Sequence, residues 1–223
     1  MGKNISIAID GPAGAGKTTV AREVARRLGY KYVDTGAMYR AVAWKSLRLG
    51  IPLSDEDAIV EIAGAMDIDF AEGDGSRIFV DSVDVSEEIR APDVTRLSSP
   101  VSAISSVRRH LVAQQRRLAG DGGVVMEGRD IGSVVLPHAE VKVFLTASVE
   151  ERARRRYEEM RAGGANAVLY TLKQEIEERD RRDSTRSDSP LVKVPDAVTI
   201  DTDGLSVNEV VERVLSLCAE KGI

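Results

Sequence analysis

The 223-residue sequence has one cysteine, two histidines and few aromatic residues, which make up 4% of it. With Cys218 alone, neither an internal disulfide nor a cysteine metal cluster can form. His110 and His138 lack the spacing of metal ligands, so we expect no zinc site. No apolar run approaches the length that spans a membrane. We therefore expect a cytoplasmic protein that does not bind membranes.

The charge balance limits the class of partner. The net charge of −5 argues against a nucleic-acid binder driven by bulk electrostatics, so we expect no nucleic-acid partner. Arginine nevertheless far outnumbers lysine and gathers late in the chain. Because the planar guanidinium suits bidentate contacts to phosphate, this bias fits repeated phosphate recognition, although a solvated surface explains many of these arginines. The length suits one domain, or one core with an inserted part, and we expect a monomer.

Short apolar runs alternate with stretches of helical periodicity, which predicts an α/β fold with a central parallel sheet flanked by helices. The predicted strands are Ile5–Ile9, Lys31–Val33, Gly123–Met126, Val141–Leu145 and Ala197–Ile200. The predicted helices are Gly16–Leu28, Ala37–Leu49, Val107–Ala119, Glu150–Arg161, Leu172–Arg182 and Val207–Glu220. In such sheets, ligands gather at the carboxyl ends of the strands.

Two segments depart from this alternation. Residues from about 52 to 90 predict a small insert, with a helix at Asp55–Ala65, strands near Ile68–Phe70, Arg77–Asp81 and Val83–Val85, and a turn at Gly73-Asp74-Gly75. Residues from about 150 to 189 form a charge-rich pair of helices that we expect to fold over the core as a lid. The core then comprises residues 1–51, 91–149 and 190–223 of a single domain.

Gly11-Pro12-Ala13-Gly14-Ala15-Gly16-Lys17-Thr18 fits the pattern G-x-x-x-x-G-K-[ST] between a predicted strand and a predicted helix. There, backbone N–H groups and the helix dipole favour phosphate. Lys17 is expected to reach the outer phosphates, and Thr18 to hold Mg²⁺ through its hydroxyl. A glycine-rich turn with an accidental lysine is the alternative, and the flanking strand and helix argue against it. The predicted triphosphate-binding residues are Gly11, Pro12, Ala13, Gly14, Ala15, Gly16, Lys17, Thr18 and Thr19.

The motif Asp34–Arg40 follows the second predicted strand and opens the next helix. Thr35 is placed to contact a ligand, and Arg40 projects one helical turn further on. A local interpretation is equally open, in which Asp34 or Thr35 caps the helix and Gly36 relieves the turn.

The motif Glu127-Gly128-Arg129-Asp130 follows the third predicted strand. If this strand neighbours the first, Arg129 and Asp130 face the ligand crevice. The cation suits a phosphate and the anion suits a donor on a base or ribose; the alternative is an ordinary surface ion pair. Asp10 and Asp130 are candidate outer partners for a magnesium ion.

A mixed-charge run near the end of the lid places Arg179, Asp183 and Arg186 at helical spacings of four and three. If they lie on one helical face, the two cations and the anion between them would bind the phosphate and the sugar of a nucleotide. A solvated salt-bridge face is the usual interpretation of such a run. Arg155 and its neighbours on the preceding helix are expected to meet the triphosphate when the lid closes.

With these motifs in this order, the chain closely resembles the bacterial cytidylate kinases, which are P-loop nucleoside monophosphate kinases. The resemblance covers essentially the whole length and rests on Ile9–Lys17, Asp34–Arg40, Gly128-Arg129-Asp130, and Glu178-Arg179-Asp180 with Arg181, Asp183 and Arg186. The family often has Asp where this chain has Glu127, and Ser where it has Thr35.

The resemblance implies transfer of the γ-phosphoryl group of ATP, with Mg²⁺, to CMP or dCMP, in pyrimidine nucleotide metabolism. It also implies that the insert binds the monophosphate. The residues carried over by position are Arg40, Arg129 and Arg186 for the acceptor's phosphate, Ser99, Arg108 and Asp130 for the cytosine, Thr35 for the wall of the same pocket, and Arg179 and Asp183 for the sugar. Lys17, Arg129 and Arg186 are the predicted catalytic residues.

Two alternatives remain open from the sequence. Another small P-loop kinase would act on UMP, AMP or a non-nucleotide acceptor, and the pattern of Arg108 and Asp130 does not rank cytosine over uracil. A non-catalytic module would bind ATP without transferring phosphate. A GTPase switch is disfavoured because the sequence has no Asn-Lys-x-Asp motif.

Overall fold

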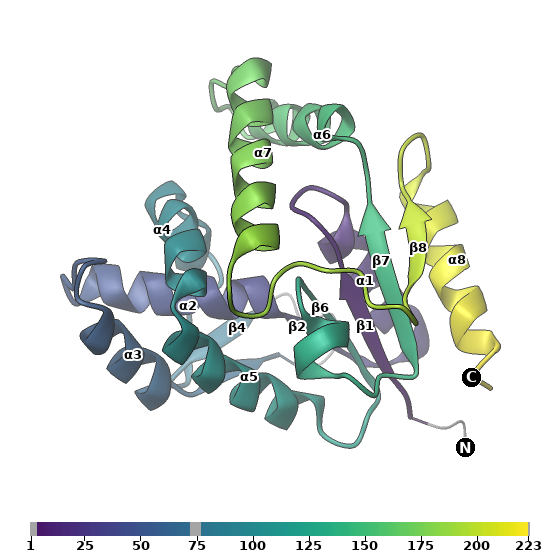
Figure 1. Cartoon of the computed structure of the whole chain (residues 1–223), viewed down its shortest axis with the longest axis horizontal. Helices are drawn as coiled ribbons and strands as arrows, with labels where there is room; N and C mark the ends of the chain where they lie inside the picture. Colours follow the sequence, from purple (N-terminus) through teal and green to yellow (C-terminus); the bar gives the residue numbers. More distant parts are fainter. Residues whose placement is uncertain (1–3, 72–76, 223) are drawn as a thin grey trace.

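The computed structural model describes residues 4–71 and 77–222 of the chain. Its centre is a parallel sheet in the order β2-β6-β1-β7-β8 (Figure 1). The strands are β1 (Ser6–Asp10), β2 (Lys31–Asp34), β6 (Val124–Gly128), β7 (Val141–Thr146) and β8 (Val198–Asp201). The predicted α/β fold is therefore confirmed. β6 pairs directly with β1, which brings the motif after β6 beside the glycine-rich loop after β1.

Alternating side chains divide the sheet into two buried faces. Ile7 of β1 and Val125 of β6 belong to the core that also holds Val24 of α1 (Lys17–Leu28) and Val214 of α8 (Val207–Ala219). Their neighbours along the strands, such as Met126, belong to the opposite core. That core is packed by α2 (Thr35–Arg48), α4 (Pro92–Ala103), α5 (Ser105–Ala119) and the short π-helical turn η2 (Ile131–Val135). Both faces are covered, as the nearly continuous apolar strands predict.

The segment from 52 to 90 follows α2 and packs on the core of α2, α4 and α5, to which its residues Ile59, Ile68 and Val80 belong. It contains α3 (Glu56–Ala65), β3 (Ile68–Phe70), β4 (Ile78–Val80), β5 (Val83–Asp84) and the 3₁₀ turn η1 (Glu88–Arg90). The strands pair antiparallel in the order β3-β4-β5, as predicted for the insert. The predicted turn at Gly73-Asp74-Gly75 lies outside the described residues.

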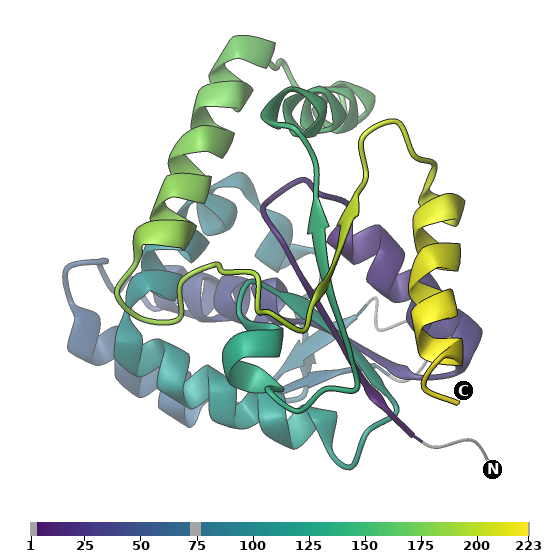
Figure 2. The same ribbon diagram turned by 45° about the vertical axis from the view of Figure 1, so that its right-hand side comes forward.

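The two charge-rich helices are α6 (Val149–Ala162) and α7 (Leu169–Thr185). Figures 1 and 2 show the pair standing beyond the carboxyl ends of the central strands, with α7 descending toward α2 and α4. This position places α7 opposite the loops that carry the predicted site. Within the described residues, no helix has both the length and the apolar composition that crossing a membrane requires.

Several boundaries differ from the predictions. α4 was not predicted, because Pro100 and a serine-rich stretch argue against a helix, yet buried Val94 and Val101 hold it against the core. α2 begins at Thr35 rather than Ala37, so Thr35 and Gly36 are helical. α7 ends at Thr185, and Arg186 is extended, so Arg186 does not continue the helical face of Arg179 and Asp183.

Candidate functional site

The loop between β1 and α1 depends on two glycines. A Cβ atom at Gly11 would stand 2.0 Å from the carbonyl oxygen of Leu145 in β7, so no side chain fits there. Gly16 is the N-cap of α1 and has φ of 88°, in the left-handed region that glycine adopts freely. The N–H groups of the first helical turn have no acceptor within the helix, so they are available to an anion at this end of α1.

Lys17 is the first residue of α1, and its side chain turns back over the loop. Its Nζ donates a hydrogen bond to the carbonyl oxygen of Pro12 over 2.7 Å, and the residue is buried. Burial, together with the positive charges of Arg129 and Arg179, lowers the pKa of Lys17 to about 7, and Glu127 opposes this effect. A phosphate beside Nζ would favour the charged ammonium.

Asp10 ends β1, and its two carboxylate oxygens accept hydrogen bonds from the backbone. The N–H groups of Ile131 and Gly132 donate to Oδ1 and Oδ2, each over 2.8 Å. Burial raises the pKa of Asp10 to about 6, although these hydrogen bonds oppose the shift. Asp10 therefore ties the segment after β6 to the end of β1, and its role as an outer partner of a magnesium ion stays a prediction.

Glu127, near the end of β6, is a buried carboxylate next to the start of α1. Tyr32 donates its hydroxyl hydrogen to Oε1 over 2.6 Å, and the Thr18 side chain also hydrogen-bonds to this carboxylate. Burial, and then the charge of Asp34, raises the pKa of Glu127. Glu127 was not among the predicted site residues. Its position at the end of a strand beside β1 is the sequence signal that would have identified it.

Oxygen donors suit Mg²⁺, which proteins commonly hold through one or two side chains together with the phosphates of a substrate. The Thr18 hydroxyl and the Glu127 carboxylate form such a pair, so the residues present fit the ion. Within the described part of the chain, no group of three histidines, cysteines or acids forms a metal cluster by itself.

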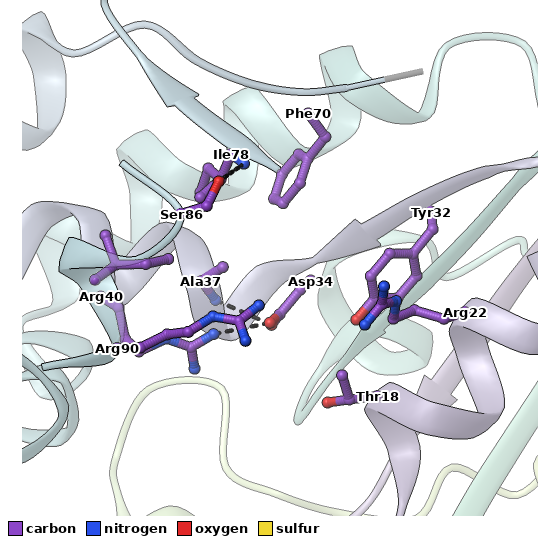
Figure 3. A pocket seen from close by; sticks show the side chains of 11 residues that line it. Thr18, Arg22, Tyr32, Asp34, Ala37, Arg40, Phe70, Ile78, Ser86 and Arg90 are labelled. Carbon is purple, nitrogen blue, oxygen red and sulfur yellow. Dashed lines mark hydrogen bonds and ion pairs between the residues drawn. The ribbon is translucent and has the colours of Figure 1, made fainter. Parts of the chain in front are cut away.

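The junction of β2 with α2 places Asp34, Thr35 and Arg40. Asp34 caps α2 by accepting from the N–H of Ala37 over 2.9 Å, and it pairs with Arg40 over 2.8 Å (Figure 3). Thr35 is buried and donates to the backbone carbonyl of Glu127 over 2.7 Å, so it joins β2 to β6. Capping by Asp34 is thus confirmed, and a ligand contact by Thr35 or Arg40 stays a prediction.

Arg108 of α5 and Asp130 form a buried ion pair, with side chains 3% and 6% exposed. The guanidinium of Arg108 also lies 5.4 Å from the ring centre of Tyr39, within range of a cation–π contact. Arg109 is exposed instead and hydrogen-bonds to Ser106. The structure therefore brings together two of the three residues predicted to read the base, Arg108 and Asp130.

Arg129, Arg179 and Asp183 meet between the end of β6 and α7. Nε of Arg129 donates to Oδ2 of Asp183 over 2.9 Å. Burial alone would raise the pKa of Asp183, but Arg129 and Arg179 lower it below its ordinary value. Burial and the charge of Arg129 lower the pKa of Arg179 to about 10. Two guanidinium groups, those of Arg129 and Arg179, therefore lie beside one carboxylate, and this group of side chains has a net positive charge.

Arg186 approaches the same region from the segment after α7. Its Nε donates to the carbonyl oxygen of Ser189 over 2.7 Å. Burial lowers the pKa of Arg186, and the positive charge of Arg108 adds to this effect. Arg40 likewise contributes to the lowered pKa of Arg179. Arg40, Arg129 and Arg186, which lie far apart in the sequence, thus converge with Arg108 and Arg179 in one electropositive region.

Unpartnered buried nitrogens mark this region as a site for an anion. Among the described residues, buried side-chain atoms without a hydrogen-bond partner include Nε of Arg40, Nε of Arg108, Nε of Arg179 and Nη2 of Arg186. Because a buried donor without an acceptor is costly, such groups are rare unless a ligand or water completes them. All four nitrogens belong to residues predicted to bind the substrate.

Arginines of α6 contact the phosphate loop directly. Arg152 is buried, donates to the carbonyl oxygen of Ala13 over 3.1 Å and pairs with Asp180 of α7 over 2.6 Å. Arg155, the predicted triphosphate contact, donates to the hydroxyl and the carbonyl of Thr202 over 3.0 and 2.8 Å. Its Nη1 lies 3.9 Å from where a Cβ atom of Gly16 would stand. The sequence grouped Arg152 with Arg154, Arg155 and Arg156 as arginines expected to meet the triphosphate, and in the structure Arg152 is buried.

Ser99 lies on α4, where its hydroxyl accepts a hydrogen bond from Nη1 of Arg182 over 3.1 Å. The described contacts do not join its hydroxyl to Arg108 or Asp130. The backbone carbonyl of Ser102, one turn further along, accepts from Arg108 instead over 3.1 Å.

Comparisons with known proteins agree with this geometry. The profile of the cytidylate kinase family matches residues 7–220. A cytidylate kinase of Desulfitobacterium hafniense (strain Y51) is 51% identical over 221 residues, covering 99% of this chain and 95% of that protein. One from Geobacillus kaustophilus (strain HTA426) is 52% identical and covers 99% of both chains.

One relative and one solved structure complete the comparison. A bifunctional pantoate ligase/cytidylate kinase of Synechococcus sp. (strain JA-2-3B'a(2-13)) is 52% identical over 95% of this chain and 40% of its own length. The crystal structure of an uncharacterised protein from Eubacterium ventriosum, 12% identical, matches with a TM-score of 0.52 over 96% of this chain and 97% of that one, which shows a shared fold alone. From the family profile and the full-length relatives, we conclude that this chain belongs to the cytidylate kinase family.

Proposed function

We propose that this protein transfers the γ-phosphoryl group of ATP to CMP or dCMP, giving ADP and CDP or dCDP. The observation that carries the proposal is the convergence of Arg40, Arg108, Arg179 and Arg186 opposite a phosphate loop, each with a buried nitrogen that has no partner. A protein that only binds ATP has no need for this second electropositive region. Membership of the cytidylate kinase family supports the choice of a cytidine nucleotide as acceptor.

In this proposal the acceptor lies between the core and α7. Arg40, Arg129 and Arg186 hold its phosphate, Arg108, Asp130 and Ser99 read the cytosine beside Thr35, and Arg179 and Asp183 contact the sugar. Residues 52–90 form the monophosphate-binding region, and residues 150–189 form the lid. Arg155 contacts the triphosphate from the lid. The buried pair of Arg108 and Asp130 supports a reading of the base edge, since it offers both donors and an acceptor.

The reaction needs little covalent assistance from the protein. The acceptor oxygen belongs to a phosphate that is already anionic at neutral pH, so no strong general base is required. The protein must instead bring two anions together in line and neutralise the charge on the transferred group. The clustered guanidinium groups supply this electrostatic stabilisation, which closure of the lid strengthens by excluding water.

Lys17 and Thr18 serve the donor side of the reaction. Lys17 exchanges its hydrogen bond with Pro12 for one with an outer phosphate oxygen, where its ammonium offsets charge during transfer. The hydroxyl of Thr18 and the carboxylate of Glu127 would hold the magnesium ion. When bound with ATP, Mg²⁺ neutralises part of the triphosphate charge.

A coupled assay of ADP release tests the proposal. The protein is mixed with ATP and Mg²⁺, and CMP, dCMP, UMP and AMP are added in turn, with chromatography to identify the product. Turnover that requires CMP or dCMP and yields the corresponding diphosphate is expected. Faster turnover with UMP or AMP would establish another acceptor, and binding of ATP without transfer to any acceptor would establish a binding module. The variant Lys17→Ala controls for a contaminating kinase.

We also propose that the protein acts as a monomer in the cytoplasm, in pyrimidine nucleotide metabolism and apart from nucleic acid. The negative net charge supports the last point.

A further inference from the structure

A pocket lies between the first turn of α1, the junction of β2 with α2 and the inserted segment (Figure 3). Thr18 and Arg22 line it from α1, Asp34 and Arg40 line it from the junction, and Arg90 lines it from η1. The pocket therefore joins the proposed magnesium contact, Thr18, to the proposed acceptor-phosphate contact, Arg40, and to an arginine with no assigned role.

The walls of this pocket carry more positive than negative charge. Three arginines and one aspartate line it. Asp34 already accepts hydrogen bonds from the N–H of Ala37 and from Arg40. Because guanidinium groups bind phosphate oxygens strongly through charge-assisted hydrogen bonds, such an excess suits a phosphate monoester, which carries close to two negative charges.

Arg90 differs from Arg40 in this pocket, because Arg40 pairs with Asp34 and Arg90 does not. Its side chain is exposed and makes no hydrogen bond or ion pair with the described residues, although Glu87 and Glu88 precede it directly. Figure 3 shows the side chain extending toward Asp34, on the side from which Arg40 also approaches. Arg90 thus approaches the same carboxylate as Arg40 without pairing with it, so its N–H donors are available to an anion that lies between the two arginines.

The backbone of Arg90 is firmly held. Ile89 beside it is 2% exposed and donates its N–H to the carbonyl of Val85 over 3.1 Å. The N–H of Arg90 donates to the carbonyl of Glu87 over 3.0 Å, and α4 begins at Pro92. The inserted segment thus presents the Arg90 side chain from a fixed base, as a ligand contact requires.

We propose that Arg90 is a further contact for the phosphate group of the acceptor nucleoside monophosphate, acting from the inserted segment while Arg40 acts from α2. This inference rests on the proposed function, since it takes the acceptor site to be where Arg40 lies. A phosphate held by both residues joins the insert to the core. Arg90 therefore contributes to binding of the acceptor and not to binding of ATP.

Calorimetric binding of CMP in the absence of ATP tests the inference, alongside steady-state values of KM for CMP and for ATP. The variants are Arg90→Ala and Arg90→Lys, and the matched control is Arg77→Ala, an exposed arginine of the same insert that does not line the pocket. For Arg90→Ala we expect the dissociation constant and the KM of CMP to rise about tenfold or more, with the KM of ATP unchanged within about twofold. Arg90→Lys is expected to recover part of the loss, because it keeps the charge without the planar donors.

Two results would overturn the inference. One is CMP binding by Arg90→Ala that matches Arg77→Ala; the other is an equal rise of both KM values, which would indicate a general structural role. If Arg90→Ala fails to fold, as judged by thermal unfolding, Arg90→Lys decides by the same criteria. If the protein without substitutions binds CMP but transfers no phosphate, the proposed function is refuted. The comparison of CMP binding between Arg90→Ala and Arg77→Ala then still decides the role of Arg90. A protein that does not bind CMP would refute both.

Discussion

Nε of Arg129 donates a hydrogen bond to Oδ2 of Asp183 over 2.9 Å, and this ion pair joins the end of β6 to α7. Both side chains are largely buried, at 18% and 8% exposure. The partners are 54 residues apart in the sequence. Through this pair, the proposed lid is connected to a strand that lies directly beside the phosphate loop.

Asp183→Asn is expected to weaken binding of the acceptor more than binding of ATP. The change replaces the charged acceptor of the proposed sugar contact and weakens the hold of Asp183 on Arg129, while the amide keeps the size of the side chain. We expect the KM of CMP to rise about tenfold, as for loss of a charged hydrogen bond, and the KM of ATP to stay within about twofold. Steady-state kinetics measure both constants. Glu177→Gln, an exposed position of the same helix, is the control, and an equal response in the two variants would contradict the proposed role.

Lys17→Ala is expected to lower kcat by about 10²- to 10³-fold, because it removes an ammonium that offsets charge on the transferred group. Binding of CMP, measured by calorimetry, should be nearly unchanged, since the acceptor contacts other residues. Lys193→Ala is the control, because Lys193 is exposed and has no proposed role in the site. Near-normal turnover of Lys17→Ala would refute its catalytic assignment.

Arg186→Ala is expected to damage phosphoryl transfer mainly through lost charge stabilisation. The residue has a buried Nη2 without a partner, which a ligand oxygen would complete. We expect kcat to fall about 10²-fold or more, with a smaller change in the KM of ATP. Single-turnover kinetics separate the transfer step from product release. A variant whose transfer rate equals that of the unchanged protein would show that Arg186 does not act on the transferred group.

Binding of ATP is expected to take up a proton at about pH 8. Burial and neighbouring arginines lower the pKa of Lys17 from 10.5 to about 7, so Lys17 is mostly neutral at this pH without phosphate. A triphosphate favours the ammonium, which raises the pKa above 8 and draws a proton from the buffer.

The uptake is measured by calorimetry of MgATP binding in two buffers whose ionisation enthalpies differ. A smaller uptake is expected near pH 6, where Lys17 is already charged. Lys17→Met should abolish the uptake at pH 8. The same proton uptake in this variant would show that another group is responsible.

The buried pair of Arg108 and Asp130 predicts a non-additive effect on stability. Asp130→Ala should lower the free energy of unfolding by about 3–5 kcal/mol, because it leaves the Arg108 charge buried without a partner. Adding Arg108→Met should recover part of this loss, since the uncompensated charge is then gone. Urea unfolding of the two single variants and the double variant measures the interaction. Additive losses would contradict a coupled pair.

Local sequence was sufficient for much of the donor site. The spacing of Gly11, Gly16, Lys17 and Thr18, between an apolar run and an amphipathic stretch, predicted a strand, a loop and a helix that the structure contains. The local pattern is sufficient here because the strand, the loop and the first turn of the helix follow one another directly along the chain.

Other elements could not be predicted from local patterns. α4 forms despite Pro100, because packing of Val94 and Val101 outweighs intrinsic propensity. α7 ends before Arg186, where the N–H of Leu191 donates to the carbonyl of Asp183 over 2.7 Å. That contact depends on how the chain turns after the helix, and helical spacing does not encode it.

By itself, the sequence determined the chemical groups available: a phosphate loop, an unusual supply of arginine, and acids placed after buried strands. Only the tertiary structure decided which of them meet. Tyr32 and Glu127 are 95 residues apart, yet the pairing of β2 with β6 brings the Tyr32 hydroxyl to the carboxylate that Thr18 also contacts. The physical reason is that the order of strands in a parallel sheet arises from long-range packing, and the same local motifs are compatible with several orders.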